Sequence, residues 1–503
     1  MYDEVIDKIC RIERAVDTTS LTYGDINYWP VCRLRLWAHL IGTKLKVSKP
    51  GPIFDDLGTA NAFPIGNPRL GLLHTDRAAA KILESPGGFS PDIIFYLRPE
   101  EYRDHIEDRA FAKILDSVYE RATDYKCLKL ELADPKAMNI RRRFPSVFMH
   151  PDTIALRTKF DPSHDLLNFT SVLPAINDLC GVSAVTSELI LQDMDKIFYF
   201  ARMFELVLRE LSPRSIFLSV YYHPTGLALM LAAHRLNIPT IDVQHGRLGP
   251  HHGLYTQMTA APTTGYALLP DYIWCWGNKT KQDIEVDKNP KCTRHGGIVG
   301  GNPWLDRWKS KHSAEILSEE TRSLEARSEG QQKILVSLQP LEVPLPALVI
   351  EAMGASPSNW IWWIRVHPLR HHTVPEISKV LSDKGIKNFE VRTATELPLF
   401  VLLRNCDHHV TAFSSVAIEA LAFGKTTTLF STVGEQIFED YVTRGLFSVA
   451  TEANDLIKQV SEALDGTNIR DDNPFINTSE GLAEKVFTHI MQDKSGAPQV
   501  RER

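Results

Sequence analysis

Three short motifs in this chain of 503 residues place polar side chains at the ends of expected strands. "IDVQHG" carries Asp242 and His245, "WIWWIRVHP" ends in His367–Pro368, and "HHVTAFSSVAIEALAFGK" carries Ser414–Ser415 ahead of a helical stretch. Carboxylates and imidazoles can take or give protons, and hydroxyls beside the N-terminus of a helix can hold phosphate. Together the motifs predict acid–base chemistry on a ligand that carries phosphate.

The two serines stand where a helix is expected to begin. Their hydroxyls and the unpaired backbone N–H groups would meet at a positive helix end, which favours phosphate, although simple N-capping is an alternative. Glu419 follows Ser415 by four residues, whereas a capping box requires three. We therefore interpret Ser414 and Ser415 as phosphate contacts, and Glu419 as a carboxylate that accepts hydrogen bonds from ribose hydroxyls.

His367 follows a strand and precedes a proline, which ends the strand because it has no backbone N–H. The histidine ring would be the first side chain free to face a cleft, where it could donate to a leaving phosphate and act as a general acid. A structural histidine is the alternative. Arg365 in the same strand, and Gln339 at the end of "ILVSLQP", are the further polar contacts predicted with the donor.

The glycine-rich stretch "GGIVGGNPWLDRW" (296–308) lacks the G-x-G-x-x-G spacing of a dinucleotide-binding loop. It is expected to let the backbone come close at a domain junction, with Asn302–Pro303 as a turn. We include Gly301 and Asn302 among the donor contacts.

Histidines recur after two of the motifs. His251 and His252 follow His245, and His371–His372 follow the His-Pro pair. Their spacing matches no zinc pattern such as H-E-x-x-H, and no G-x-S-x-G nucleophile elbow is present. We expect no metal in the site, no tightly bound cofactor and no serine-hydrolase chemistry, with His251 and His252 at the entrance of the cleft.

Strands and helices alternate along the chain, which predicts right-handed βαβ units and parallel sheets covered on both faces. The first series has strands at 91–99, 127–132, 215–222 and 239–243, and helices at 107–123, 195–211 and 224–237. The second series begins near 272, with strands at 272–277, 334–340, 360–368, 408–415 and 426–431. This is an α/β fold of two doubly wound, Rossmann-like domains facing a central cleft, where ligands bind outside the carboxyl ends of the strands.

The domain boundaries follow from the two series. Residues 1–90 form an N-terminal extension or a helical part of the first domain, with an amphipathic helix over 23–42. Residues 91–270 form the first Rossmann-like domain and residues 271–490 the second. Residues 491–503 form a disordered tail.

Composition restricts the partners. The net charge of −6, from 56 basic and 62 acidic side chains, argues against wholesale nucleic-acid binding. Arg141–Arg143 is a local basic cluster, either a solvated loop or a contact for anionic lipid or polyphosphate. Seven cysteines without a C-x-x-C pair indicate reduced thiols. With no signal peptide and no apolar run of about 20 residues, the sequence predicts a cytoplasmic protein, and a peripheral membrane contact is left open.

The order of "QHG", "GGNPWLD", "RVHP" and "TAFSSVAIEALAFGK" resembles that in bacterial GT-B glycosyltransferases of capsule and lipopolysaccharide assembly. The similarity covers about residues 215–445. Sialyltransferases and polysialyltransferases, Kdo transferases and polyol-phosphate transferases are the families with similar His-Pro and Ser-Ser motifs. The resemblance implies a nucleotide sugar as donor, a cell-surface glycan or glycolipid as acceptor, and catalysis without a tightly bound metal.

The resemblance also implies roles for the motif residues. His367 with Pro368, and Ser414 with Ser415, would hold the nucleotide and its phosphate, and Glu419 would contact the ribose. The base in the first domain would fall on Asp242 or His245, with His245 preferred as the residue at the open end of its strand. The resemblance favours a CMP-sugar as donor. The chain departs from the sialyltransferases because it lacks their D/E-D/E-G motif, so a UDP-sugar remains open.

Three other functions remain open from the sequence. A non-hydrolysing UDP-sugar 2-epimerase shares this architecture and similar motif positions. A CDP-polyol phosphotransferase would release CMP and leave a phosphodiester. A nucleotide-sensing or scaffold subunit would bind nucleotide without turnover.

Overall fold

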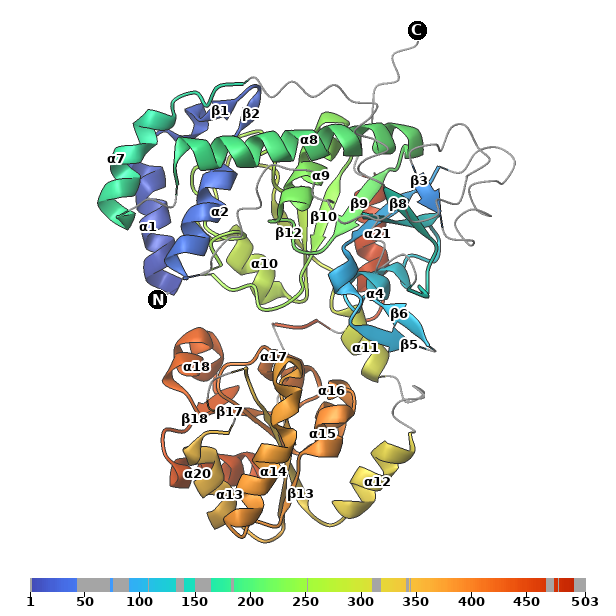
Figure 1. Cartoon of the computed structure of the whole chain (residues 1–503), viewed down its shortest axis with the longest axis vertical. Coiled ribbons are helices and arrows are strands. Elements are labelled where there is room, and N and C mark those ends of the chain that lie inside the picture. Colours follow the sequence, from blue (N-terminus) through green and yellow to red (C-terminus); the bar gives the residue numbers. More distant parts are fainter. Residues whose placement is uncertain are drawn as a thin grey trace. The chain divides into compact units, whose positions relative to one another are not determined.

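The computed structural model describes residues 2–42, 73–75, 90–106, 108–132, 140–149, 164–181, 185–250, 252–309, 318–340, 343, 345–466, 475–477 and 479–492. The chain divides into two compact units (Figure 1). Unit 1 comprises residues 1–303 and 479–503, and unit 2 comprises residues 304–478. His251 and residues 493–503 lie outside the described residues.

Unit 1 is built on an eight-stranded sheet that is parallel except at β3, which pairs antiparallel with β8. In sheet order the strands are β12 (Gly296–Val299), β11 (Tyr272–Cys275), β10 (Thr240–Val243), β9 (Ser215–Leu218), β4 (Ile93–Leu97), β7 (Cys127–Leu132), β8 (Ser146–Met149) and β3 (Leu73–Thr75). Apart from β3, sequence order runs outward in both directions from β4, so the topological switch point lies between β4 and β9. Ligands of open α/β sheets bind at such a point.

Helices cover both faces of this sheet. α8 (Ser187–Leu211) and α9 (Pro224–Arg235) pack together on one face, and α21 (Leu482–Gln492) packs on the other (Figure 1). Ile94 and Tyr96 of β4 belong to the core on the first face, and Phe95 packs with Phe487 of α21 in the core on the second. The strands are accordingly mostly apolar, as expected for a parallel sheet buried on both faces, although Lys129, Glu131 and Asp242 are buried within them. The remaining described helices are α1 (Tyr2–Ala15), α2 (Trp29–Leu40), α4 (Leu115–Tyr119), α7 (Phe169–Cys180) and α10 (Asn278–Glu285).

Unit 2 holds a six-stranded sheet in which every described pair is parallel. Its strands, in sheet order, are β15 (Phe389–Glu390), β14 (Trp360–Arg365), β13 (Gln332–Ser337), β16 (His408–Thr411), β17 (Thr427–Leu429) and β18 (Phe447–Val449). This is the 3-2-1-4-5-6 order of the Rossmann fold, with its switch point between β13 and β16. The prediction of two Rossmann-like α/β domains is confirmed, and the central cleft stays a prediction.

Helices of unit 2 alternate with its strands. Those described are α12 (Glu319–Arg327), α13 (Ala347–Ala355), α14 (Val374–Asp383), α15 (Arg392–Glu396), α16 (Leu399–Asn405), α17 (Val416–Ala422), α18 (Thr432–Ile437), α19 (Glu439–Thr443) and α20 (Ala453–Asp465). α11 (Pro303–Lys309) begins at the boundary between the two units.

The predicted boundary at residue 271 is wrong. β11 pairs in parallel with β10, through Asp242↔Ile273 and Val243↔Trp274, and β12 pairs with β11. Residues 271–303 therefore complete the sheet of unit 1, and α21 returns to it. A strand shows its own apolar run in the sequence but not which sheet it joins, because pairing is a tertiary contact.

Two predicted helices are also corrected. In the stretch 107–123, β6 (Arg109–Phe111) pairs with β5 (Asp104–Ile106), and only α4 is helical. In the stretch 23–42, the first residues belong to the hairpin of β1 (Thr22–Tyr23) and β2 (Ile26–Asn27), and the helix begins at Trp29. That helix is buried nearly all round, including Arg33 and Arg35, so it packs in the core of unit 1 and is not amphipathic.

Candidate functional sites at the sheet edges

The carboxyl ends of β4, β9 and β10 bring a group of polar side chains together in unit 1. Arg98 follows β4, residues 219–223 follow β9, and Gln244–Gly246 follow β10. Among the described residues, four buried side-chain polar atoms at this edge and the loop packed on it have no hydrogen-bond partner: Asp242 Oδ1, His223 Nε2, His245 Nδ1 and His252 Nδ1. Because buried polar groups are normally paired, these four atoms make the edge a candidate ligand site.

Asp242 is the carboxylate of this edge. It is fully buried, and its Oδ2 accepts from the Tyr255 hydroxyl (2.6 Å) and the Tyr221 backbone N–H (3.3 Å). Burial raises the pKa of Asp242 to about 7, against the opposing effect of these hydrogen bonds. A carboxyl group with that pKa is half ionised near neutral pH and suits a general base.

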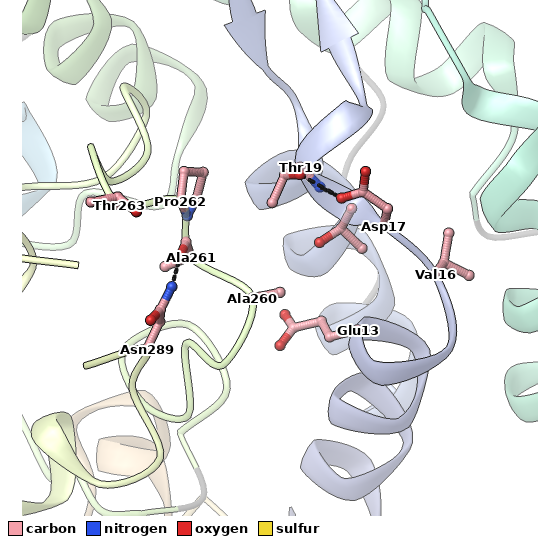
Figure 2. A pocket seen from close by; sticks show the side chains of 10 residues that line it. Glu13, Val16, Asp17, Thr19, Ala260, Ala261, Pro262, Thr263 and Asn289 are labelled. Carbon is pink, nitrogen blue, oxygen red and sulfur yellow. Dashed lines mark hydrogen bonds between the residues drawn. The ribbon is translucent and has the colours of Figure 1, made fainter. Parts of the chain in front are cut away.

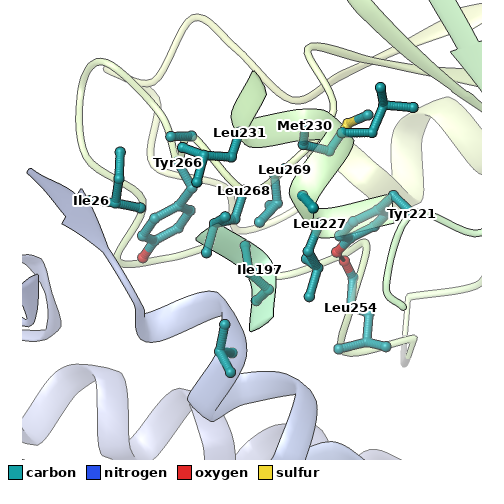
Figure 3. Packing of buried hydrophobic residues seen from close by; sticks show 14 of the residues in the cluster. Ile26, Ile197, Tyr221, Leu227, Met230, Leu231, Leu254, Tyr266, Leu268 and Leu269 are labelled. Atoms are coloured by element: carbon teal, nitrogen blue, oxygen red, sulfur yellow. Dashed lines mark hydrogen bonds between the residues drawn. The ribbon is translucent and has the colours of Figure 1, made fainter. Parts of the chain in front are cut away.

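The backbone beside Asp242 is strained. Val220 has φ +63°, a left-handed conformation that a β-branched residue rarely adopts and that costs about 1–3 kcal/mol. The next residue, Tyr221, directs its N–H at Asp242 and its hydroxyl at the carbonyl of Leu254 (Figure 3). These two contacts hold the strained turn, and strain of this kind is concentrated at functional sites.

His245 lies in the same group as Asp242, as the sequence predicted. Its Nε2 is 3.4 Å from the Tyr222 hydroxyl, and its ring lies beside that of Tyr255. The turn is set by Gln244, whose amide accepts from the Trp276 N–H (2.7 Å) and donates to the Gly246 carbonyl (2.8 Å). Burial lowers the pKa of His245 to about 3, so the ring is neutral and a weaker base than Asp242.

The N-terminal helices hold the loop that carries Tyr255. Arg33 of α2 donates from Nε to the Gly253 carbonyl (2.5 Å) and from Nη2 to those of Thr256 (2.9 Å) and Gln257 (3.2 Å). Trp37, one turn on in the same helix, stacks on His252 at 5.6 Å. A Cβ at Gly253 would lie 2.5 Å from the Trp37 ring, so only glycine permits this approach. His252 is therefore a packed residue of this loop.

A cavity of unit 1, of about 480 Å³, lies away from this edge, beside the end of α1 (Figure 2). Its lining includes Glu13 and Asp17 on one side and Ala261 and Asn289 on the other. Glu13 is occupied, because it pairs with Arg33 and accepts from Trp29 Nε1 and the Thr259 hydroxyl. The Asn289 amide donates to the Ala261 carbonyl and closes the opposite wall.

The buried histidines predict an acid-labile fold. Burial lowers their pKa values to between about 3 and about 4, so they are neutral when folded, whereas an unfolded histidine binds a proton near pH 6.5. Stability is then lost as pH falls below 6.5, by about 1.4 kcal/mol per histidine per pH unit. The residues are His223, His245, His252, His295, His408 and His409. We expect the Tm to fall steeply from pH 6.5 to pH 4.5 in scanning calorimetry, and a flat profile would contradict these protonation states.

In unit 2, the predicted residues gather at the ends of β14, β13 and β16. Gln339 spans the switch point: with its amide oxygen directed at the loop after β16, it accepts from the N–H groups of Ser414 (2.7 Å) and Phe413 (3.3 Å). His367 accepts the Leu369 N–H on Nδ1 (3.2 Å), which leaves Nε2 to carry the proton of the neutral ring. Partial burial lowers the pKa of His367.

The serine pair begins α17 with different degrees of exposure. Ser415 is exposed, precedes the helix and makes no capping bond with its side chain, whereas the Ser414 hydroxyl accepts the Val416 N–H (3.3 Å). Glu419 is buried in this seven-residue helix, with 9% of its surface exposed. Pro368 begins the 3₁₀ turn Pro368–Thr373 and is exposed. The phosphate and ribose contacts stay predictions.

Three other predicted donor contacts lie elsewhere. Arg365 donates to the carbonyls of Ala394 (3.1 Å) and Leu397, and so fixes the end of α15. Gly301 and the buried Asn302 belong to unit 1, where the Gly301 carbonyl accepts from Trp274 Nε1 (2.8 Å). Pro303 begins α11, so the predicted Asn302–Pro303 turn is the start of a helix.

Two of the three arginines at 141–143 form ion pairs within unit 1. Arg142 is buried and forms a bidentate ion pair with Glu131 (2.8 Å), between the rings of Tyr102 and Phe148. Arg143 pairs with Glu120. Two of the three arginines are thus committed within unit 1, and the interpretation of the whole cluster as a solvated loop or an anion contact is wrong.

The sequence reasoning missed His223, Arg98 and Tyr255. His223–Pro224 repeats the dipeptide of His367–Pro368, and this signal was available in the sequence. Arg98 and Tyr255 carry no motif, and only the fold brings them to the edge. In the described ranges, no three His, Cys, Asp or Glu side chains are grouped so that they could hold a metal ion. No described helix is long and apolar enough to cross a membrane.

Two parallel sheets with surrounding helices, each with polar groups outside the carboxyl ends of its strands, define a two-unit Rossmann-like α/β protein. Searches of protein-family models and of curated protein sequences find no match.

Among solved structures, the chain is similar to UDP-GlcNAc 2-epimerase from Neisseria meningitidis bound to UDP-GlcNAc, with 14% identity, TM-score 0.49, and coverage of 79% of this chain and 99% of that one. The epimerase from Methanocaldococcus jannaschii has 14% identity and TM-score 0.47, with coverage of 79% and 99%. The α,α-trehalose 6-phosphate synthase from Burkholderia multivorans has 10% identity and TM-score 0.41, with coverage of 80% and 93%. At these values the likenesses carry no inference about activity.

Proposed function

We propose that this chain is a metal-independent GT-B glycosyltransferase that acts in the cytoplasm and moves a sugar from a nucleotide-activated donor, a CMP-sugar by preference, to a cell-surface glycan. The observation that carries the proposal is Asp242 in unit 1: a buried carboxyl group with a pKa of about 7 and an unpaired Oδ1. A scaffold subunit gains nothing from such a group, because an unpaired buried polar atom destabilises the fold.

In the proposed reaction, Asp242 takes the proton of an acceptor hydroxyl as that oxygen attacks the anomeric carbon of the donor. The bond from the anomeric carbon to the nucleotide phosphate breaks, and the electron pair leaves with the phosphate. The electrostatics favour Asp242 over His245 as the base, because the His245 pKa of about 3 leaves little proton affinity near neutral pH.

Unit 2 would bind the nucleotide. Its Rossmann strand order favours a ligand outside β13 and β16, where Ser414 and Ser415 lie, and His367 directs a protonated Nε2 away from its own backbone contact. That N–H would donate to the departing phosphate, which stabilises the charge that develops in the transition state. No tightly bound metal or other cofactor is part of the proposal.

The test uses the full chain in a thermal-shift panel of CMP, UDP, GDP and CDP, because a ligand of the folded state raises the Tm. His367→Ala and Ser415→Ala should lose the nucleotide shift and reduce turnover with the matching nucleotide sugar at least 100-fold. The Tm of unliganded Ser415→Ala should equal that of the wild type, since this serine makes no capping bond. Ser382→Ala, on the exposed face of α14, is the matched control. Near-normal transfer by both site variants would refute the assignment.

A UDP-sugar 2-epimerase is the second candidate, and one observation favours it. Burial raises the pKa of Glu101 to about 7 despite its ion pair with Arg98 (3.0 Å), so unit 1 has two carboxyl groups with pKa values near neutrality, Glu101 and Asp242. Epimerisation removes a proton from carbon and returns one, which suits such a pair. Incubation with a UDP-sugar alone separates the candidates, because an epimerase changes its substrate without an acceptor.

A further inference from the structure

We propose that His223, at the switch point of unit 1, belongs to a binding site for sugar hydroxyl groups, in which the ring of His223 is a fixed hydrogen-bond donor. This inference deepens the proposed function, since the bound sugar would be the acceptor on which Asp242 acts. Four observations support the site. They are the tautomer of His223, the lack of a partner for its Nε2, a second His-Pro cap of the same kind in unit 2, and the position of His223 after β9, beside the switch point of the sheet.

The tautomer follows from the helix cap. His223 is the N-cap of α9, and its Nδ1 accepts the Gly226 backbone N–H at 3.0 Å. The hydroxyl of Thr225 lies 2.9 Å from the same nitrogen and accepts from Tyr96. A nitrogen that accepts from a backbone N–H carries no proton, so the neutral ring has its proton on Nε2. Burial, with Arg98 nearby, lowers the pKa of His223 to about 3 and keeps the ring neutral.

The orientation of the ring is fixed as well. A Cβ at Gly226 would lie 2.3 Å from the Tyr221 carbonyl oxygen and 3.0 Å from His223 Nε2, so glycine is required for this close packing. The ring also stacks on Tyr96. The donor is therefore held in place before any ligand arrives, which reduces the entropy lost on binding.

The donor on Nε2 has no acceptor among the described residues, although the atom is buried. Leaving such a group unpaired costs about 1–3 kcal/mol, which a ligand oxygen would recover. The unpaired atoms of the same edge include an acceptor, Asp242 Oδ1. A donor and an acceptor together suit hydroxyl groups, which both accept and donate, better than an anion, which only accepts.

Unit 2 repeats the arrangement. His367 is also followed by proline, also serves as N-cap, and also accepts a backbone N–H on Nδ1. Each unit thus uses a His-Pro cap to orient an Nε2 donor at the carboxyl edge of its sheet. In unit 1, the residues on either side of the switch point are Arg98 after β4 and the segment 219–223 after β9. Open α/β sheets bind their ligands there.

The first measurement is the ¹⁵N NMR spectrum of the histidine rings in the full chain, with the His223 signals assigned by their loss in His223→Asn. We expect the neutral Nε2–H tautomer, without titration from pH 5 to pH 8. Glucose, N-acetylglucosamine and glycerol are then added in the presence of the nucleotide that raises the Tm, with inorganic phosphate as the anionic probe. At least one of the two sugars should shift the Nε2–H signal of His223.

Asparagine can keep the cap, because its side-chain oxygen accepts the Gly226 N–H, but it has no donor at the position of Nε2. His223→Asn should therefore keep the wild-type Tm and the Tm shift caused by the nucleotide. Its affinity for the sugar should fall at least 10-fold, as measured by titrating the sugar and recording the ring signals of His245. His223→Ser, which also caps, replaces it should the asparagine variant fail to fold. His39→Asn, on the exposed side of α2, is the matched control.

The possible outcomes separate the inference from the proposed function. An Nδ1–H tautomer, a response to phosphate alone, or unchanged sugar affinity in both capping variants would overturn the role of His223. The role of His223 is also overturned if neither sugar moves its signal while a nucleotide still raises the Tm. In that case the nucleotide-binding part of the proposed function survives. If no nucleotide raises the Tm but a sugar moves the His223 signal, the proposed function fails and the site of unit 1 stands.

Discussion

Asp242→Asn is expected to stabilise the protein at pH 8 and to do so less at pH 5, while it abolishes turnover. Burial raises the pKa of Asp242 from 3.8 to about 7. In the unfolded chain the carboxyl group ionises near pH 4, so its contribution is fully present below that pH and is lost as the pH rises to 7. Asparagine cannot ionise and keeps an acceptor for Tyr255 and Tyr221.

The size of the effect follows from the same shift. Between pH 5 and pH 8 the free energy of unfolding of the wild type should fall relative to that of Asp242→Asn by on the order of 3 kcal/mol. We expect the difference in Tm between the two proteins to widen by several degrees over this range in scanning calorimetry. In the proposed reaction Asp242 would then destabilise its own fold, a known compromise between stability and function.

Two further variants control the measurement. Tyr255→Phe removes a hydrogen bond that lowers the Asp242 pKa. In this variant the loss of stability should therefore extend to a higher pH than in the wild type. Asp465→Asn replaces an exposed aspartate at the end of α20 and should show a constant Tm difference from the wild type at every pH. A constant difference for Asp242→Asn would mean that the carboxyl group does not titrate near neutral pH.

Arg33→Met is expected to destabilise unit 1 by about 3–5 kcal/mol, the usual cost of removing one member of a buried ion pair. Both Arg33 and Glu13 have only 2% of their side chains exposed, so Glu13 would remain as a buried charge without its partner. The change would also remove the hydrogen bonds that Arg33 donates to the carbonyl oxygens of Gly253, Thr256 and Gln257. Urea denaturation followed by circular dichroism measures the loss.

The double variant Glu13→Gln/Arg33→Met separates the ion pair from the loop contacts. Removing both charges often costs little in a buried pair, so the double variant should regain part of the stability that Arg33→Met loses. It should not regain turnover, because the loop that carries Tyr255 to Asp242 has lost its anchor. Arg209→Met, at the exposed end of α8, is the control. Full activity of Arg33→Met would show that α2 is not needed to place Tyr255.

The sequence motifs identified the residues at strand ends in each candidate site. They missed the residues that only contacts between distant parts of the chain bring there. Asp242 and His245 could be found because a polar residue at the end of an apolar strand is visible in one stretch of sequence. Tyr255 reaches Asp242 through a loop that Arg33, more than 200 positions earlier, holds in place. Such a contact leaves no local pattern. His223 had a pattern, the His-Pro pair, but it fell between the predicted strand 215–222 and the predicted helix 224–237 and was given no role.

Most of the central strands and covering helices could be predicted from the sequence, but the β1–β2 and β5–β6 hairpins could not. Apolar runs of four to six residues and the helical spacing between them specify parallel strands and covering helices, because burial on both faces demands that pattern. Only the tertiary structure decided which sheet each strand joins and where the switch points lie, since pairing joins residues remote in sequence. It also decided the chemistry of Asp242. Burial raises the pKa of this carboxyl group, and burial depends on the packing of the whole unit.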